Sequence, residues 1–205
     1  MKQFAHSLFL IAMLCSPIPA FAADFYMAGS IGQARTNISK SDIDNIVIEG
    51  GATNVNSTVD NTDTAYKLLL GYQFNPYLGI EGGYVDLGKT TYAATATQGN
   101  ATLAWKAKGW LLSAVGTLPV NDSFGVFAKL GAFHSEVSWN LAATGSIDAN
   151  EAWSGTKWKA AYGVGASYNL NKQVGFRLEY EVFDKLGDVN KDKVDFISAG
   201  VVYKF

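Results

Sequence analysis

Catalysis is the first chemistry to consider, because the tripeptide His134-Ser135-Glu136 contains residue types that hydrolases use. A hydrolase of this kind needs the histidine to accept the proton of the serine hydroxyl through a hydrogen bond. The tripeptide lies in a segment with the alternating pattern of a β-strand, and adjacent residues of a strand point to opposite faces. His134 and Ser135 are therefore not placed to act as base and nucleophile, and the sequence predicts a protein without catalytic residues.

Metal and cofactor sites are not predicted either. Cys15 is the one cysteine of the chain and lies in its apolar N-terminal segment, so no disulfide or cysteine-ligated metal is expected after it. An acidic stretch further along lacks the Asp-x-Asp-x-Asn-Gly run of a calcium loop and is expected to be a solvated loop. Its carboxylates are Asp42, Asp44, Glu49, Asp60 and Asp63.

The N-terminal segment has the features of a secretory signal peptide. Lys2 precedes a short apolar run, and Ala20-Phe21-Ala22 is a small-x-small cleavage site. The run is shorter than the roughly 20 residues that a membrane-spanning helix needs. We therefore expect residues 1–22 to be a cleaved signal peptide and residues 23–205 to form one domain. Removal of Lys2 takes the net charge from −2 to −3, so no basic surface for nucleic acid is expected.

The remaining sequence alternates between apolar and other residues with the period of β-strands rather than that of helices. Segments of about ten residues carry this pattern, which is the length of a strand that crosses an outer membrane. The eight predicted strands are residues 25–35, 65–74, 77–87, 108–118, 124–137, 157–170, 174–183 and 194–205.

Short and long connections alternate between these segments. Three are tight and rich in turn-forming residues, namely Asn75-Pro76, residues 119–123 and residues 171–173. The other four, residues 36–64, 88–107, 138–156 and 184–193, are mostly longer and polar, and are predicted to be solvated loops. Such an alternation places short turns at one rim of a barrel and long loops at the other, as in outer-membrane barrels.

The two faces of the predicted strands differ in composition. One face is apolar or aromatic, as at Leu68, Leu70 and Leu178, whereas the other carries glycine and charged residues such as Lys67 and Arg177. A soluble barrel has the reverse arrangement, with an apolar interior and a charged exterior. In hydrocarbon a sheet must also close, since an open edge leaves backbone groups unpaired. The sequence therefore predicts an eight-stranded antiparallel up-and-down transmembrane β-barrel with long extracellular loops and short periplasmic turns.

The tryptophans fall into two groups in this scheme. Trp110 and Trp158 lie near strand ends, where an aromatic girdle is expected at the membrane interface. Trp105, Trp139 and Trp153 fall in or beside the predicted loops. Packing within the loops is one explanation for this second group, and a protruding β-ribbon that binds a host ligand is the alternative.

Several stretches resemble the membrane domain of OmpA-type outer-membrane proteins. Residues 70–84 are similar to the second hairpin of that family, residues 127–131 to its fifth strand, and residues 176–180 with 198–205 to its last two strands. The resemblance implies a location in the outer membrane of a Gram-negative bacterium. Because the sequence ends at Phe205, we expect only the membrane domain, without the peptidoglycan-binding domain that such barrels commonly carry.

The resemblance also implies an interior salt-bridge network that fills the lumen and could act as a gate. The matching residues are Glu81, Lys129, Arg177 and Glu179. Val115 and Ser167 stand where the family has a lysine and a glutamate, so Arg177 is not expected to exchange between partners. A purely structural role is the alternative to a gate, since buried charges in a narrow barrel must be paired in any case.

The expected function is that of a non-enzymatic outer-membrane protein whose barrel contributes to envelope structure and whose loops face the outside. Two alternatives are a narrow pore for ions or small solutes, gated by the salt-bridge network, and an adhesin or host-interaction factor acting through the loops. The expected partners of a monomeric barrel are outer-membrane lipid, lipopolysaccharide, periplasmic chaperones and the barrel assembly machinery. Tyr203 and Phe205 resemble the C-terminal signal that this machinery reads. A host ligand would be a further partner.

Overall fold

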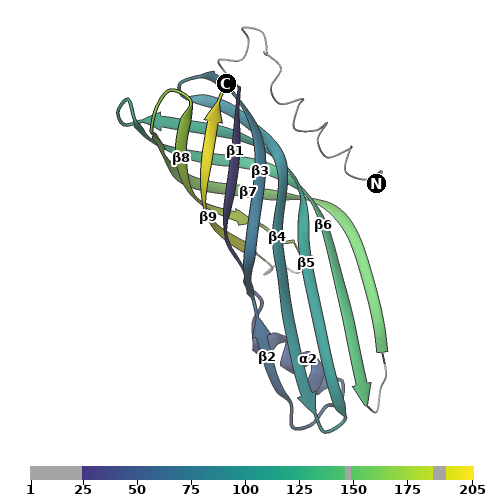
Figure 1. The fold of residues 1–205 in the computed structure, drawn as a ribbon. Helices are drawn as coiled ribbons and strands as arrows, with labels where there is room; N and C mark the ends of the chain where they lie inside the picture. Colours follow the sequence, from purple (N-terminus) through teal and green to yellow (C-terminus); the bar gives the residue numbers. More distant parts are fainter. Residues whose placement is uncertain (1–24, 146–148, 187–192) are drawn as a thin grey trace, which may run out of the picture.

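Antiparallel strands make up most of the structure, a computed structural model that describes residues 25–145, 149–186 and 193–205 (Figure 1). The predicted signal peptide, residues 1–22, lies outside these ranges. The described elements are β1 (Phe25–Thr36), α2 (Lys40–Glu49), β2 (Asn56–Asp60), β3 (Thr62–Asn75), β4 (Leu78–Ala96), β5 (Gly99–Pro119), β6 (Phe124–Gly145), β7 (Ala149–Asn169), β8 (Val174–Phe183) and β9 (Val194–Lys204).

Eight of these strands close into a ring. Neighbours follow in the order β4-β3-β1-β9-β8-β7-β6-β5, and β5 pairs with β4 to complete the circle. The first and last strands meet in this ring, since Met27 of β1 lies opposite both Leu70 of β3 and Tyr203 of β9. The additional strand β2 pairs with β4. The predicted eight-stranded antiparallel up-and-down barrel is confirmed.

The three short turns share one local geometry. In each turn an asparagine side chain accepts hydrogen bonds from the backbone N–H groups two and three residues further on, at distances of 2.8–2.9 Å. These asparagines are Asn75, Asn121 and Asn171. An asparagine side chain can thus replace the backbone acceptor of a turn, which is why this residue type recurs at the same rim of the barrel.

The opposite rim differs from the prediction of long solvated loops. Residues 88–107 and 138–156 lie mostly in strands, because β4 and β5 are separated by residues 97–98 alone and β6 and β7 by residues 146–148. With 21 residues, β5 has about twice the length that a tilted strand needs to cross a bilayer. Strands β4, β5, β6 and β7 therefore continue past the barrel as a curved four-stranded ribbon (Figure 1).

A β-bulge explains why the sequence pattern appears to end at Gly88. The pairing of β4 with β5 shifts register between Asp86 and Lys89, and Gly88 has a φ of +72°. The backbone N–H of Gly88 donates to the Asp86 carboxylate at 2.9 Å, and that of Lys89 donates to Asp63 at 2.8 Å. Gly88, in the left-handed region within β4, thus marks a bulge that bends the sheet, and the strand continues beyond it.

The predicted loop at residues 36–64 contains α2 and β2. Its helix places Ile43 and Val47 half-buried on one side, at the i, i+4 spacing of a helical face. Asp44 holds the helix to the ribbon, because its carboxylate accepts hydrogen bonds from Ser57 of β2 at 2.5 Å and from Tyr92 of β4 at 2.8 Å. Among the residues in the described ranges, no helix is long and apolar enough to cross a membrane.

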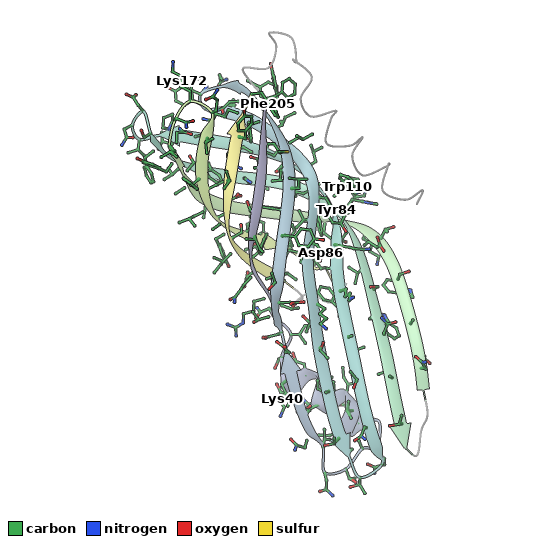
Figure 2. All side chains as sticks on the ribbon, in the orientation of Figure 1. Lys40, Tyr84, Asp86, Trp110, Lys172 and Phe205 are labelled. Carbon is green, nitrogen blue, oxygen red and sulfur yellow. The ribbon has the colours of Figure 1, made fainter. Side chains whose placement is uncertain are left out.

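Inside and outside of the barrel follow the predicted alternation. Leu68, Leu70 and Leu178 are exposed on the outer face, as a lipid-facing surface requires. Trp110 and Trp158 are exposed as well, and Figure 2 shows Trp110 with Tyr84 partway between the end marked by Phe205 and the ribbon end near Lys40. Trp110 thus lies at about the level where the ribbon leaves the barrel, as expected for a residue of the aromatic girdle.

Candidate functional site

Charged side chains gather inside the barrel because the strands bring alternate residues to the lumen. Glu81 comes from β4, Lys129 from β6, and Arg177 and Glu179 from β8. The structure brings these four predicted residues together and adds Lys67 of β3 and Glu181 of β8. We call these six side chains the interior network, and none of them is more than 8% exposed.

Glu81 lies at the centre of one half of the interior network. Its Oε1 is 2.5 Å from the Nη1 of Arg177, and its Oε2 is 2.6 Å from the Nζ of Lys129. The hydroxyl of Tyr26 on β1 also donates to Oε1, at 2.7 Å. Three groups from three other strands therefore bind one carboxylate, which ties β1, β4, β6 and β8 together across the lumen.

Glu179 and Glu181 organise the other half. The Nζ of Lys67 lies 3.0 Å from the Oε2 of Glu179 and also pairs with Glu181. Lys129 bridges the two halves, because its Nζ lies 2.5 Å from Glu179 and 2.6 Å from Glu81. The interior network contains three cations and three carboxylates, so its formal charge sums to zero.

Aromatic rings surround the cations. The guanidinium carbon of Arg177 lies 4.7 Å from the centroid of Phe127 and 5.6 Å from that of Tyr26. The Nζ of Lys67 lies 5.4 Å from the ring centroid of Phe196. Such contacts attract a cation most strongly where water is excluded. These contacts favour a fixed position for the Arg177 and Lys67 side chains and shield their charges from solvent.

An apolar layer fills the lumen further along the strands, away from the short turns. Phe133 of β6 packs edge-on against Phe183 of β8 with their ring centroids 4.9 Å apart. Both rings are fully buried, as are Leu69 and Phe196. An eight-stranded barrel is only wide enough to be filled by side chains. The interior network and this apolar layer together fill much of the lumen with buried side chains.

Sequence reasoning missed Lys67, Glu181 and Tyr26 as members of the interior network. Lys67 and Glu181 carried a usable signal, because alternation places both on the lumen face and a buried charge needs a partner of opposite sign. Tyr26 carried no such signal, since an aromatic residue near a strand end is expected in the girdle. Its contact with Glu81 depends on the pairing of β1 with β3, which brings Tyr26 opposite Gly71. A side chain at Gly71 would overlap the Tyr26 ring.

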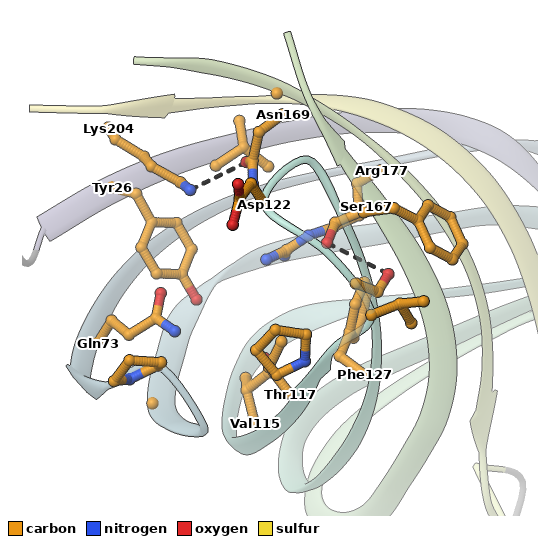
Figure 3. A pocket seen from close by; sticks show the side chains of 18 of the residues that line it. Tyr26, Gln73, Val115, Thr117, Asp122, Phe127, Ser167, Asn169, Arg177 and Lys204 are labelled. Atoms are coloured by element: carbon orange, nitrogen blue, oxygen red, sulfur yellow. Dashed lines mark hydrogen bonds between the residues drawn. The ribbon is translucent and has the colours of Figure 1, made fainter. Parts of the chain in front are cut away.

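A polar vestibule of about 620 Å³ lies between the interior network and the short turns (Figure 3). Arg177 and Tyr26 form its inner end, and Lys204 of β9 donates to the Asn169 side chain at 2.9 Å beside it. Val115 and Ser167 line the same space and contribute no charge. Among the described residues, Glu81 and Glu179 are the carboxylates within 4.0 Å of Arg177.

The other candidate residues lie apart from this site. Ser135 is buried and donates to the backbone carbonyl of Lys157 at 3.0 Å, whereas the ring of His134 packs against Trp158 with centroids 4.8 Å apart. In the described ranges no group of three or more His, Cys, Asp or Glu residues could hold a metal ion. Tyr203 and Phe205 are exposed and stack edge-on at 5.4 Å.

Comparisons with known proteins agree with this architecture. A family model described as the OmpA-like transmembrane domain matches residues 20–205. Outer membrane protein A of Klebsiella pneumoniae is 29% identical over 161 residues, which cover 76% of this chain and 45% of the relative. Its counterpart in Serratia marcescens is 32% identical over 142 residues, or 66% of this chain and 38% of the relative. The chain thus spans less than half the length of these relatives.

Solved structures show the same fold at low sequence identity. Ail of Yersinia pestis, crystallised with the heparin analogue sucrose octasulfate, gives a TM-score of 0.50 at 20% identity, covering 89% of this chain and 99% of Ail. Neisserial surface protein A gives 0.50 at 20% identity, with 88% of this chain and 97% of that protein covered. The N-terminal barrel of Pseudomonas aeruginosa OprF gives 0.50 at 12% identity, with 89% and 98% covered.

Proposed function

Because this chain belongs to the OmpA-like transmembrane domain family and so resides in the Gram-negative outer membrane, we propose that it acts there as a non-enzymatic, closed anchor. The barrel stabilises the envelope, and the ribbon of β4 to β7 is held above the outer surface. Residues 1–22 direct export as a signal peptide that is then cleaved, and Tyr203 and Phe205 form the signal for the barrel assembly machinery. The barrel acts as a monomer.

The observation that carries this proposal is that buried, paired side chains fill much of the lumen. Six buried charges from four strands neutralise one another, and the apolar layer behind them excludes water. Moving an ion through the barrel would require separating pairs that lie at hydrogen-bonding distance in a medium of low dielectric constant, where each separation costs several kcal/mol. This favours an anchor over an open channel.

A gated pore is the second candidate, favoured by the vestibule of about 620 Å³ that leads to Arg177. Movement of the Arg177 side chain away from Glu81 would connect this vestibule with the rest of the interior network. In that case the same contacts that close the lumen would form the gate. The conductance measurement described at the end of the Discussion separates a permanently closed barrel from a gated one.

Display of the ribbon on the cell surface can be tested with single cysteines. Cys15 lies in the predicted signal peptide, so a cysteine introduced elsewhere would be the only thiol of the exported chain. Asn100→Cys places an exposed thiol near the far end of the ribbon, and Lys172→Cys places one in a short turn at the opposite end. We expect a membrane-impermeant maleimide to label Asn100→Cys on intact cells and Lys172→Cys only after the outer membrane is permeabilised. Labelling in the reverse order would overturn the proposed orientation.

A further inference from the structure

Four ring-bearing side chains form a row on the outer face of the barrel, at the level where the ribbon begins (Figure 2). The row runs across β4, β5, β6 and β7, where its members lie directly opposite one another: Tyr84, Trp110, His134 and Trp158. The rings of Tyr84 and Trp110 pack edge-on with their centroids 5.7 Å apart. Aromatic rings on the outside of a barrel mark the boundary between hydrocarbon and polar head groups. We call these four residues the aromatic row.

The β-bulge of β4 turns Lys89 towards the outside just above the aromatic row. Before the bulge the buried residues of β4 are odd-numbered, as at Val85 and Leu87. Beyond it they are even-numbered, as at Thr90 and Tyr92. In an unbroken alternation residue 89 would face inward, whereas here its side chain is exposed on the outer face. Bulges commonly redirect a side chain in this way.

Two lysines thereby meet on neighbouring strands. Lys89 lies directly opposite Lys106 of β5, and both side chains are exposed. Neither lysine forms an ion pair with a carboxylate of the described residues, whereas Lys108 pairs with Glu136 at 3.8 Å. Like charges directly opposite one another destabilise an antiparallel sheet. An anion bound between Lys89 and Lys106 would offset this repulsion.

The residues between the two lysines and the aromatic row carry charges of both signs. Asp86 lies opposite Lys108, and Lys108 lies opposite Glu136, its ion-pair partner. Positive charge without a neighbouring counter-charge is therefore concentrated one step further from the membrane centre, at Lys89 and Lys106. A ligand that approaches this surface meets the two free ammonium groups together.

Hydroxyl groups continue the row of the two lysines on the next strands. Ser138 of β6 lies opposite Lys106, and Ser154 of β7 lies opposite Ser138. We call Lys89, Lys106, Ser138 and Ser154 the lysine-serine row. Ammonium groups bind phosphate as point charges, and serine hydroxyls both donate to and accept from the hydroxyl groups of a sugar. The lysine-serine row is thus complementary to a phosphorylated sugar.

The lysine-serine row lies at the depth of lipid head groups. Lys106 precedes Trp110 by four residues, which is about 10 Å above the aromatic row on a strand tilted by roughly 40°. Polar head groups extend some 5–7 Å beyond the hydrocarbon core, and long lysine side chains can lie along the protein surface to reach them. The outer leaflet of a Gram-negative outer membrane presents lipid A, whose head group is a phosphorylated glucosamine disaccharide.

We propose that the lysine-serine row binds the phosphorylated head group of lipid A in the outer leaflet. Lys89 and Lys106 hold one phosphate between them, and the hydroxyls of Ser138 and Ser154 face the sugar. This inference rests on the proposed orientation of the ribbon towards the outside and deepens the anchor function, because it gives the barrel a specific lipid contact. Purified protein suffices for its test, so failure here is distinct from failure of the orientation or of the closed lumen, which cysteine labelling and conductance test.

NMR of the refolded protein in phosphatidylcholine nanodiscs tests the proposal, with diphosphoryl lipid A added in increasing proportion and divalent cations removed. Dimethylation of the lysines with ¹³C before refolding retains their positive charge and gives each a separate resonance. We expect the resonances of Lys89 and Lys106 to shift saturably, and that of Lys172 in a short turn at the opposite rim to follow lipid A content without saturation. Shifts of Lys89 and Lys106 that merely parallel those of Lys172 would overturn the proposal.

Two further probes identify the group that is recognised. Lipid A from which both phosphates have been removed should leave the resonances of Lys89 and Lys106 unchanged. Inorganic phosphate added to nanodiscs of phosphatidylcholine alone should shift them far less than the same concentration of phosphate carried by lipid A. Equal shifts with dephosphorylated lipid A would contradict phosphate recognition, and equal shifts with inorganic phosphate would contradict recognition of a lipid.

Variants locate the site. Lys89→Gln combined with Lys106→Gln should weaken binding of diphosphoryl lipid A by at least about tenfold, since one lysine near an anionic membrane surface contributes about fivefold. Lys89→Arg combined with Lys106→Arg should retain binding, because the charges are kept. Lys172→Gln removes the same charge at the opposite rim and should change binding less than twofold. Equal weakening by the Lys172 variant would show that only net charge matters.

Denaturant unfolding separates recognition from a structural role of the two lysines. In phosphatidylcholine alone, the double glutamine variant should unfold at the same or a higher urea concentration than the unchanged protein, because it removes a repulsion. Lipid A should raise the midpoint of the unchanged protein, as any ligand of the folded state does, and should leave that of the variant in place. A rise of equal size in both proteins would contradict binding at the lysine-serine row.

Discussion

At the scale of single residues, Lys67 illustrates how charges are paired inside the lumen. It was not among the residues expected to form a gate, yet its ammonium group contacts both Glu179 and Glu181. Its side chain is fully buried. A buried ion pair adds little net stability compared with well-packed apolar residues, but removing one partner leaves a charge without compensation. Lys67 is therefore a residue whose loss the barrel should not tolerate easily.

Lys67→Met is predicted to lower the free energy of unfolding by roughly 3–5 kcal/mol, because three carboxylates would then face two cations in a dry interior. Lys108→Met is the matched control, since Lys108 forms a half-exposed pair with Glu136 at 3.8 Å. The control should change the free energy of unfolding by at most about 1 kcal/mol. Denaturant unfolding of both variants in the same lipid provides the comparison. Equal unfolding midpoints would show that the interior charges are solvated.

Most residues of the interior network could be predicted from the sequence, but not every contact between them. Alternation and the resemblance placed Glu81, Lys129, Arg177 and Glu179 on the lumen face, and the structure brings them together. The contact of Tyr26 with Glu81 could not be foreseen. It spans 55 residues of sequence and depends on which residue of β3 lies opposite β1.

At the scale of elements, the strands were predictable where lipid surrounds them and less so where water does. Within the membrane the outer face must be apolar, so alternation marks each strand. In the ribbon, the outward residues of β4 and β5 are polar, as at Thr95, Asn100 and Thr102, and resemble loop residues in composition. Gly88 also favoured the wrong prediction of a loop at residues 88–107, because a glycine in a bulge cannot be told from a loop glycine by sequence.

Helix α2 was missed although the sequence contained weak signals for it. Ser39 occupies the position before the helix, Ile43, Ile46 and Val47 have helical spacing, and Gly50 with Gly51 ends it. The acidic residues of this stretch suggested a solvated loop instead. Their role is local, because Asp44 attaches the helix to β2 and β4.

The attachment of α2 should depend on pH through Asp44. Hydrogen bonds from Ser57 and Tyr92, together with the nearby charge of Lys40, hold the pKa of this carboxyl below its usual value. A carboxyl with a lowered pKa in the folded state stabilises the fold above its unfolded pKa of about 3.9 and loses this contribution as pH falls towards the folded value. We therefore expect α2 to stay attached from pH 7 to about pH 4 and to loosen below that.

The methyl resonances of Val47, followed by NMR between neutral and acidic pH, measure this attachment. Asp44→Asn should abolish the acid transition and leave the Val47 resonances in one position throughout. Glu49→Gln changes an exposed carboxylate at the end of the same helix and should retain the transition. A transition that persists in Asp44→Asn would assign the pH dependence to another group.

At the scale of the whole molecule, the protein combines two parts with opposite surface properties. The barrel has lipid outside and neutralised charges inside, and its short turns are fixed by asparagine side chains. The ribbon extends the same strands into water, with polar residues outside and indole rings inside. Because β4 to β7 run through both parts, the ribbon is a direct continuation of the barrel sheet.

The proposed closure of the lumen is tested most directly by single-channel conductance of the refolded protein in a planar bilayer. Arg177→Ala is compared with the unchanged protein, and Arg35→Ala, an exposed arginine of β1, serves as the control. We predict no discrete openings from the unchanged protein or from Arg35→Ala. Openings are expected from Arg177→Ala, because loss of the guanidinium joins the vestibule to an interior network that then holds three carboxylates and only two cations. Regular openings from the unchanged, verifiably folded barrel would contradict a closed anchor and favour the gated pore.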